Sequence, residues 1–172
     1  MTTPPSRILV VGVGNVLHGD DGFGVVLAAR LATEPWPPGV KIMETGIGGI
    51  SIVQELMTGY AAVLLLDAHR AGGPPGVLRL LAPSLPELGS LDVHARRDYF
   101  SDTHYATPIR ALALLEAIGH LPPRVAILGC EPGEHERLAI GLSAPVAAAM
   151  DRASELAHEW VTAESAAANR SS

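Results

Sequence analysis

The sequence contains one cysteine, one lysine and no long hydrophobic run, and each scarcity excludes a class of protein. Cys130 has no partner for an internal disulfide, which favours a cytoplasmic protein. The longest uninterrupted apolar stretch, Ala61–Leu66, is far shorter than the roughly 20 residues that a membrane helix needs. The net charge of −6 disfavours nucleic acid as a partner, because phosphates attract lysine and arginine. Residues 1–6 lack the basic start and apolar run of a leader peptide.

The composition that remains is that of a single folded domain. The 172 residues are 48% apolar and 17% charged, which excludes a disordered chain. A domain of this length buries roughly 70% of its unfolded surface and needs neither a disulfide nor a structural metal to fold.

Hydrophobic patterning predicts alternating strands and helices, which is typical of an α/β fold with a mostly parallel sheet. We expect strands at Arg7–Val13, Val40–Met43, Tyr60–Asp67, Gly76–Leu81 and Arg124–Gly129, and helices at Gly22–Thr33, Ile50–Met57, Ala106–Ile118 and Ser143–Trp160. Asp21 is expected to cap the first helix. The stretch Ala82–Tyr105 reads as a long loop, and Ala163–Ser172 as a disordered tail.

Ligands of open parallel sheets bind beyond the carboxyl ends of the strands, so the loop after the first strand is the first candidate site. Its sequence, VGVGNVLHGDDGFGV, fails the dinucleotide pattern G-x-G-x-x-G because Leu17 stands at the last glycine position. The loop instead ends in Asp20 and Asp21, whose charge would repel a pyrophosphate. Spacing alone leaves open whether Asp21 is functional or only caps the helix.

A second acidic residue, Asp67, ends a run of aliphatic residues that needs no carboxylate for packing, which favours a functional role. Two carboxylates and a histidine would form an open site for Mn, Fe, Ni or Zn. Of the seven histidines, His94 and His104 lie in the long loop, and spacing does not decide between them.

Other catalytic signatures fail. There is no G-x-S-x-G motif, and the His135-Glu136 and His158-Glu159 pairs lack the second histidine of H-E-x-x-H. Cys130 follows a strand, where it is either a nucleophile or, as we favour, a buried inert thiol.

Six segments in order resemble the hydrogenase maturation endopeptidases, which trim the C-terminal tail of the large subunit of nickel-iron hydrogenases. They are GVGNVLHGDDGFG (12–24), TGIGG (45–49), LLLDAH (64–69), PPGVLRLL (74–81), SDTHYATP (101–108), and the closing GCEP (129–132) with GLS (141–143). The resemblance spans about residues 7–160. It implies a three-layer α/β/α sandwich on a mixed, mostly parallel five-stranded sheet, with the strand near Val77–Leu81 antiparallel.

The resemblance also implies the site. The family's metal-contacting acid, aspartate and histidine correspond to Asp21, Asp67 and His104, with a ligand or general-base role for each left open. Nickel would be supplied by the precursor, with no permanently bound cofactor. We therefore expect a cytoplasmic monomer that meets a nickel-iron hydrogenase large-subunit precursor transiently. Its protease domain would span residues 7–162, between flexible tails at 1–6 and 163–172.

The sequence departs from the family pattern in the loop after the second strand. In the family this loop is associated with substrate choice. Glu44 replaces the usual aspartate, and Gly46-Ile47-Gly48 lacks a hydroxyl. We assign Glu44, Gly46, Gly48 and Gly49 to substrate binding. Two alternatives stay open at this point: a non-enzymatic nucleotide- or metal-binding module, and a hydrolase with its own permanent metal.

Overall fold

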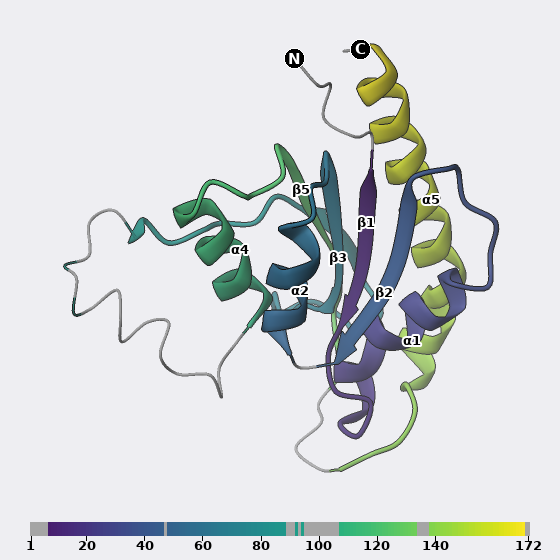
Figure 1. Ribbon diagram of the computed structural model, residues 1–172. Helices are drawn as coiled ribbons and strands as arrows, with labels where there is room; N and C mark the ends of the chain where they lie inside the picture. The colour runs from purple at the N-terminus through teal and green to yellow at the C-terminus, as the bar shows by residue number, and fades with distance from the viewer. Residues whose placement is uncertain are drawn as a thin grey trace.

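The structure, a computed structural model, describes residues 7–46, 48–88, 92, 94, 107–133 and 138–170. Strands and helices alternate along the chain (Figure 1). They are β1 (Ile8–Val13), a 3₁₀ turn η1 (Gly19–Gly22), α1 (Phe23–Leu31), β2 (Val40–Gly46), α2 (Gly49–Leu56), β3 (Ala62–Ala68), β4 (Leu78–Leu81), α4 (Pro108–Ala117), β5 (Arg124–Cys130) and α5 (Ala144–Arg170).

The strands form one five-stranded sheet in the order β2-β1-β3-β5-β4. All neighbours run parallel except β4, which is antiparallel to β5. This confirms the predicted mixed sheet and its antiparallel strand near Val77–Leu81. Since β1 and β3 are neighbours, the loops that follow them begin side by side.

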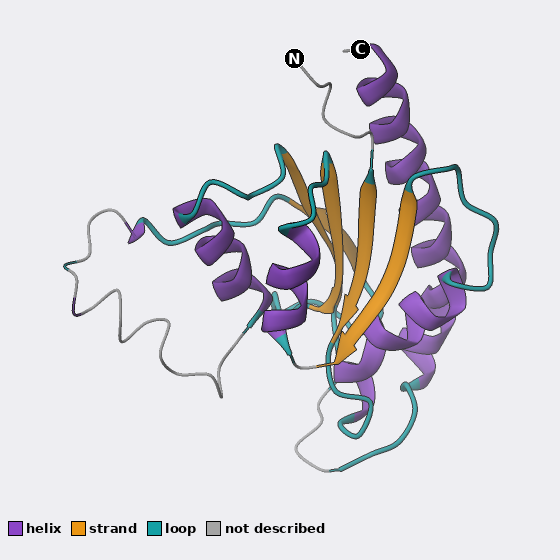
Figure 2. Ribbon diagram, viewed as in Figure 1, coloured by secondary structure: helices purple, strands orange, loops and turns teal. Residues whose placement is uncertain are grey.

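Helices cover both faces of the sheet, as Figure 2 shows. Because strand side chains alternate between the faces, Ile8 and Val10 pack toward α1 and α5, whereas Leu9 and Val11 pack toward α2 and α4. Every residue of β1 is buried, which agrees with a sequence that is aliphatic at every position except Gly12. No helix in the described part of the chain has the length and apolarity to cross a membrane.

Helix α5 is longer than the sequence indicated. The tail from Ala163 was expected to be disordered, but α5 continues to Arg170. Val161 is buried, and Glu164 forms an ion pair with Arg124 at the start of β5, with a shortest nitrogen–oxygen distance of 3.0 Å. These tertiary contacts accompany an extension that local composition did not suggest. Residues 1–6, expected to form a flexible tail, lie outside the described part.

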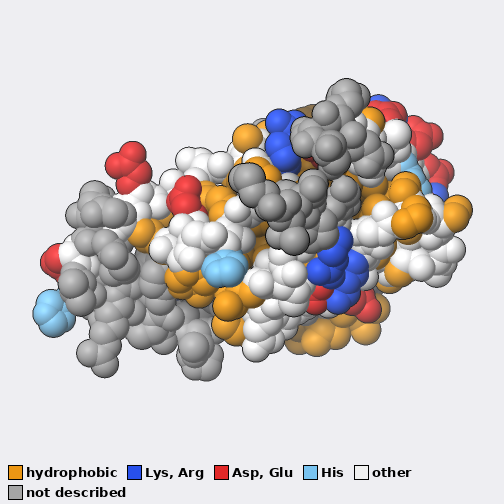
Figure 3. All heavy atoms as spheres, turned by 45° about the horizontal axis from the view of Figure 1, so that its top comes forward, with side chains coloured by type: hydrophobic (Ala, Val, Ile, Leu, Met, Phe, Trp, Pro, Cys, Tyr) orange, Lys and Arg blue, Asp and Glu red, His pale blue; other side chains and the backbone are white. Residues whose placement is uncertain are grey.

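The two edges of the sheet differ. The arrowheads of β1 and β2 point to the lower edge in Figure 1, where the loops after β1 and before α5 gather. Figure 3 turns the upper edge forward, and there acidic, basic and hydrophobic side chains are interspersed. The candidate site lies at the lower edge, at the carboxyl ends of the parallel strands.

Candidate active site

The start of α1 approaches the sheet closely because glycines line the contact. A Cβ atom on Gly24 would stand 2.0 Å from the carbonyl oxygen of Leu66 in β3 and 2.4 Å from that of Val13 in β1. A Cβ atom on Gly12 would stand 2.1 Å from the carbonyl oxygen of Gly24. The glycines of the first loop therefore allow helix–strand packing, and they bring the residues before α1 to the end of β3.

Asp67 is an acid with a strongly raised pKa at this edge. It lies near the end of β3, half-buried, in register with Gly129 of β5. Burial, with a smaller contribution from the negative charge of Asp21, raises the pKa of Asp67 from its ordinary 3.8 to about 7. A carboxyl group with a pKa near neutrality at a strand end is typical of functional sites.

Asp21 is exposed and lies within electrostatic reach of Asp67. Its Oδ2 accepts a hydrogen bond of 3.0 Å from the backbone N–H of Asn15. The predicted cap was wrong: Gly22 is the N-cap of α1, and no side chain caps that helix. The reason is the 3₁₀ turn η1, which places Asp21 inside a turn before α1 begins and frees its carboxylate from capping.

The adjacent carboxylate, Asp20, has a different environment. It is fully buried and accepts hydrogen bonds from the backbone N–H of Gly133 at 2.8 Å and from the backbone N–H and hydroxyl of Ser143 at 2.6 and 2.8 Å. Asp20 thus ties the first loop to the segments on either side of residues 134–137. The sequence showed an Asp-Asp pair but no sign that its two members face different partners.

Glu131 holds the loop after β3 in a similar way, and the sequence analysis missed it too. Its buried carboxylate accepts hydrogen bonds from the backbone N–H groups of Ala71 and Gly72 and pairs with Arg79 of β4 at 2.9 Å. Burial alone would raise the pKa of Glu131, but these donors lower it on balance. The loop that follows Asp67 is therefore fixed to the end of β5.

The loop after β2 reaches the same edge. The carbonyl oxygen of Gly46 accepts a hydrogen bond of 3.0 Å from the backbone N–H of Gly14, which joins this loop to the one that carries Asp21. Glu44 is exposed, Gly48 donates its backbone N–H to the carbonyl of Thr45, and Gly49 begins α2. The predicted substrate-binding residues Glu44, Gly46, Gly48 and Gly49 therefore all lie in or beside this loop, whereas Ile47 is outside the described residues.

Thr45 is the extra residue of a bulge in β2, since Gly12 pairs with Glu44 and Val13 pairs with Gly46. Its Oγ1 is buried and has no hydrogen-bond partner among the described residues. The sequence of this loop, Gly46-Ile47-Gly48, shows that a hydroxyl is missing, but it does not reveal the unpartnered hydroxyl of Thr45, because a bulge leaves no mark in the sequence pattern.

Thr45→Val should raise the free energy of unfolding by about 1 kcal/mol, because an unpartnered buried hydroxyl is desolvated without compensation. Urea denaturation measures the change. Thr33→Val is the matched control: its hydroxyl donates to the carbonyl of Arg30 at 2.7 Å, so this variant should gain nothing. A loss of stability in Thr45→Val would mean that the hydroxyl is bonded in solution.

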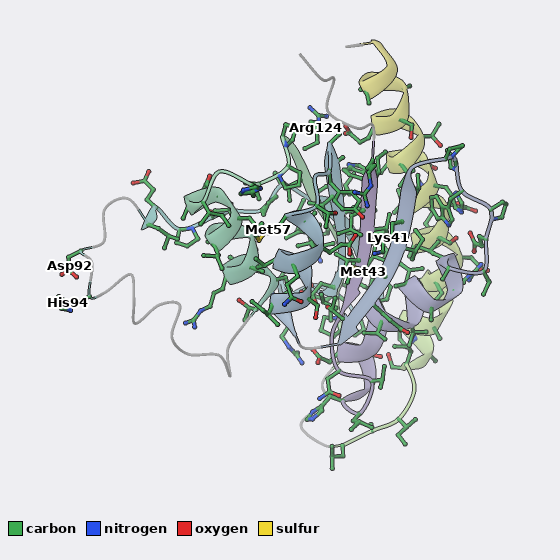
Figure 4. The ribbon with its side chains drawn as sticks, viewed as in Figure 1. Lys41, Met43, Met57, Asp92, His94 and Arg124 are labelled. Carbon is green, nitrogen blue, oxygen red and sulfur yellow. The ribbon has the colours of Figure 1, made fainter. Side chains whose placement is uncertain are left out.

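The third predicted residue, His104, lies outside the described residues. His94 is exposed and lies beyond the sheet, at the outer part of the long loop in Figure 4. His69 lies closer: it follows β3, and its Cβ would be 2.7 Å from a Cβ built on Gly129. Within the described part of the chain, no three His, Cys, Asp or Glu side chains form a metal-binding group.

Cys130 is buried at the end of β5. Burial, with the charges of Asp20 and Glu131, raises the pKa of its thiol to about 11. A thiol with this pKa carries little thiolate at neutral pH and is a poor nucleophile.

Cys130→Ala should therefore retain nearly full activity, with a modest loss of stability from the small cavity it creates. Activity and thermal unfolding of the two proteins can be compared directly. A folded but inactive Cys130→Ala protein would restore the nucleophile hypothesis.

Comparison with known proteins identifies the family. The family profile described as hydrogenase maturation protease matches residues 25–160. The chain belongs to this family. The hydrogenase expression/formation protein HupD of Rhodobacter capsulatus is 31% identical over 150 residues, which cover 86% of this chain and 67% of that protein.

Solved structures of the family agree. The hydrogenase 2 maturation peptidase of Thaumarchaeota archaeon SCGC_AB-539-E09 superposes with a TM-score of 0.65 at 33% identity, over 91% of this chain and 98% of that one. The [NiFe] hydrogenase maturation protease HycI of Thermococcus kodakarensis gives a TM-score of 0.60 at 27% identity, over 91% of each chain. The fold and the peptidase activity expected from the sequence are thereby confirmed. The alternative of a non-enzymatic binding module is not supported.

Proposed function

We propose that this protease removes the C-terminal extension of a nickel-iron hydrogenase large-subunit precursor after nickel has been inserted. The observation that supports the proposal is the pair of carboxylates, Asp21 and Asp67, at one edge of the sheet. Asp67 is half-buried, and its pKa is about 7, partly because of the negative charge of Asp21. An exposed acid beside a perturbed one, at the carboxyl ends of parallel strands, suits a site that engages a metal-bearing substrate.

In this proposal Asp21, Asp67 and His104 contact the nickel that the precursor already carries. Nickel accepts carboxylate oxygen and imidazole nitrogen, and substrate groups would complete its coordination. A precursor without nickel would lack these contacts, so the protease would cleave the precursor only after nickel has been inserted. The loop of Glu44, Gly46, Gly48 and Gly49 would hold the polypeptide beside the metal.

Two routes to peptide-bond cleavage are compatible with this arrangement. Either the substrate's nickel polarises the scissile carbonyl or a bound water, or a carboxylate takes a proton from the attacking water. A pKa near 7 lets Asp67 exist as carboxylate and as acid at neutral pH, which suits a general base.

The test is a processing assay. Immature large subunit is incubated with the protease, with and without prior nickel loading, and its mass is measured. We expect shortening of the nickel-loaded precursor alone. Equal cleavage of the metal-free precursor would contradict nickel-dependent recognition, and no cleavage of either would contradict the proposed substrate.

Elemental analysis of the purified protease tests where the metal resides. We expect less than one bound transition-metal ion per chain, because the nickel is expected to arrive with the substrate. Tight stoichiometric metal that survives dialysis against a chelator would instead identify a hydrolase with a resident metal centre.

A further inference from the structure

Two loops at the candidate active-site edge expose large apolar side chains. In the loop after β1, Val16 and Leu17 are 44% and 54% exposed, and before α5, Leu138 and Ile140 are 77% and 90% exposed. We call these four side chains the apolar ridge. A group of strongly exposed aliphatic side chains commonly marks an interaction surface.

The apolar ridge is held in place by backbone pairing. The N–H of Ala139 donates to the carbonyl of Leu17 at 3.0 Å, and the N–H of Gly19 donates to the carbonyl of Ala139 at 2.7 Å. His18 and Ala139 form an isolated parallel bridge. The two loops are therefore joined at a β-bridge, which presents the ridge in a defined conformation and lowers the entropy lost on binding.

Two further contacts anchor the apolar ridge to the body of the protein. Gly22 packs against Val16 so closely that a Cβ on Gly22 would lie 2.9 Å from the Cα of Val16. Buried Asp20, between the two loops, accepts hydrogen bonds from Gly133 and Ser143, which flank the second one. Packing and the Asp20 bonds therefore both restrain the ridge.

The apolar ridge is also continuous with the candidate active site. Asn15, which precedes Val16, donates its backbone N–H to the Asp21 carboxylate. Figure 1 shows the loops after β1 and before α5 together below the arrowheads of the sheet. A protein substrate whose chain reaches Asp21 therefore has its neighbouring surface next to the ridge.

We propose that the apolar ridge docks the folded body of the large-subunit precursor through an apolar depression beside the segment that is cut; this rests on the function proposed above. The exposure of Leu138 and Ile140 indicates a convex surface, because a side chain in a groove would be shielded by its walls. A convex apolar surface fits a depression in a folded partner, whereas an extended tail needs a groove or an open strand edge. The folded body is therefore a better occupant than the C-terminal extension.

The experiment compares steady-state processing of nickel-loaded precursor by the wild type and by the double variant Leu138→Ser/Ile140→Ser. We expect KM to rise about tenfold or more with kcat nearly unchanged, because two exposed contacts are lost from docking while the reacting groups are untouched. The matched control is Met57→Ser/Ile118→Ser, which changes residues 50% and 45% exposed just after α2 and α4. Its KM should stay within about twofold of the wild type.

A conservative variant guards against misfolding. Leu138→Met/Ile140→Val keeps apolar side chains and should restore KM to near the wild-type value, and thermal unfolding should be the same for all four proteins. An unchanged KM in the serine variant, with the wild type active, would overturn the docking role alone. A wild type that does not shorten the precursor would overturn the proposed function and the docking role with it. A dimer of the wild type that the serine variant abolishes would identify a second copy as the occupant and overturn the proposal.

Discussion

Asp67→Asn is expected to lose at least 100-fold in processing rate and, at pH 8, to gain stability. The loss follows if the carboxylate contacts nickel or takes a proton, because an amide does neither well. The gain follows from burial and from the nearby charge of Asp21, which together raise the pKa of Asp67 to about 7. The charged form is therefore disfavoured in the folded protein, and the neutral amide removes that cost.

The pH dependence of this gain has a definite sign. Because the folded pKa lies above the ordinary 3.8, the folded state binds more protons than the unfolded state between about pH 4 and pH 7. Asp67 therefore lowers the stability of the wild type as pH rises through this window. Below about pH 4 the wild type and Asp67→Asn should be equally stable. Above about pH 7 the free energy of unfolding of the variant should exceed that of the wild type by up to about 4 kcal/mol.

Urea denaturation at pH 4, 6 and 8 measures the difference, and pull-down of nickel-loaded precursor separates the two roles. An inactive variant that still binds the precursor supports Asp67 as general base, whereas loss of binding supports Asp67 as ligand. In the wild type, processing should rise with pH through about 7 as Asp67 ionises. An Asp67→Asn protein that is less stable than the wild type at pH 8 would show that the carboxylate has a structural role.

Replacing Asp20 by alanine should mainly lower stability, whereas replacing Asp21 by alanine should mainly lower activity. Asp20→Ala leaves the buried donors of Gly133 and Ser143 without an acceptor, which should cost about 3 kcal/mol or more. Asp21→Ala loses one exposed hydrogen bond from Asn15 and should cost about 1 kcal/mol or less. Asp21→Ala should nevertheless abolish processing, because it removes the exposed acid beside Asp67.

Denaturation midpoints and single-turnover processing of the two variants provide the comparison, each serving as the control for the other. Asp21→Ala should also lower the apparent pKa seen in any residual activity, since the charge that raises the pKa of Asp67 is removed. Unfolding of Asp21→Ala, or full activity in it, would contradict its assignment to the site.

The local pattern was sufficient for the order of strands and helices. The aliphatic run of β1 and the run before Asp67 are typical of strands covered on both faces, and the structure has both. The rule that ligands bind at the carboxyl ends of parallel strands indicates Asp21 and Asp67 from the sequence alone. The choice of His104 came from resemblance, and it stays a prediction.

Other features depended on contacts between distant segments. The sequence by itself determined the α/β class, the strand-end acids and the glycines of the first loop. Only the tertiary structure decided that Asp20 is a buried anchor while Asp21 is exposed, because the partners of Asp20 lie more than 100 positions away. It likewise decided the raised pKa of Asp67 and the length of α5, because burial and long-range pairing depend on how the sheet brings distant residues together, and local pattern carries no such information.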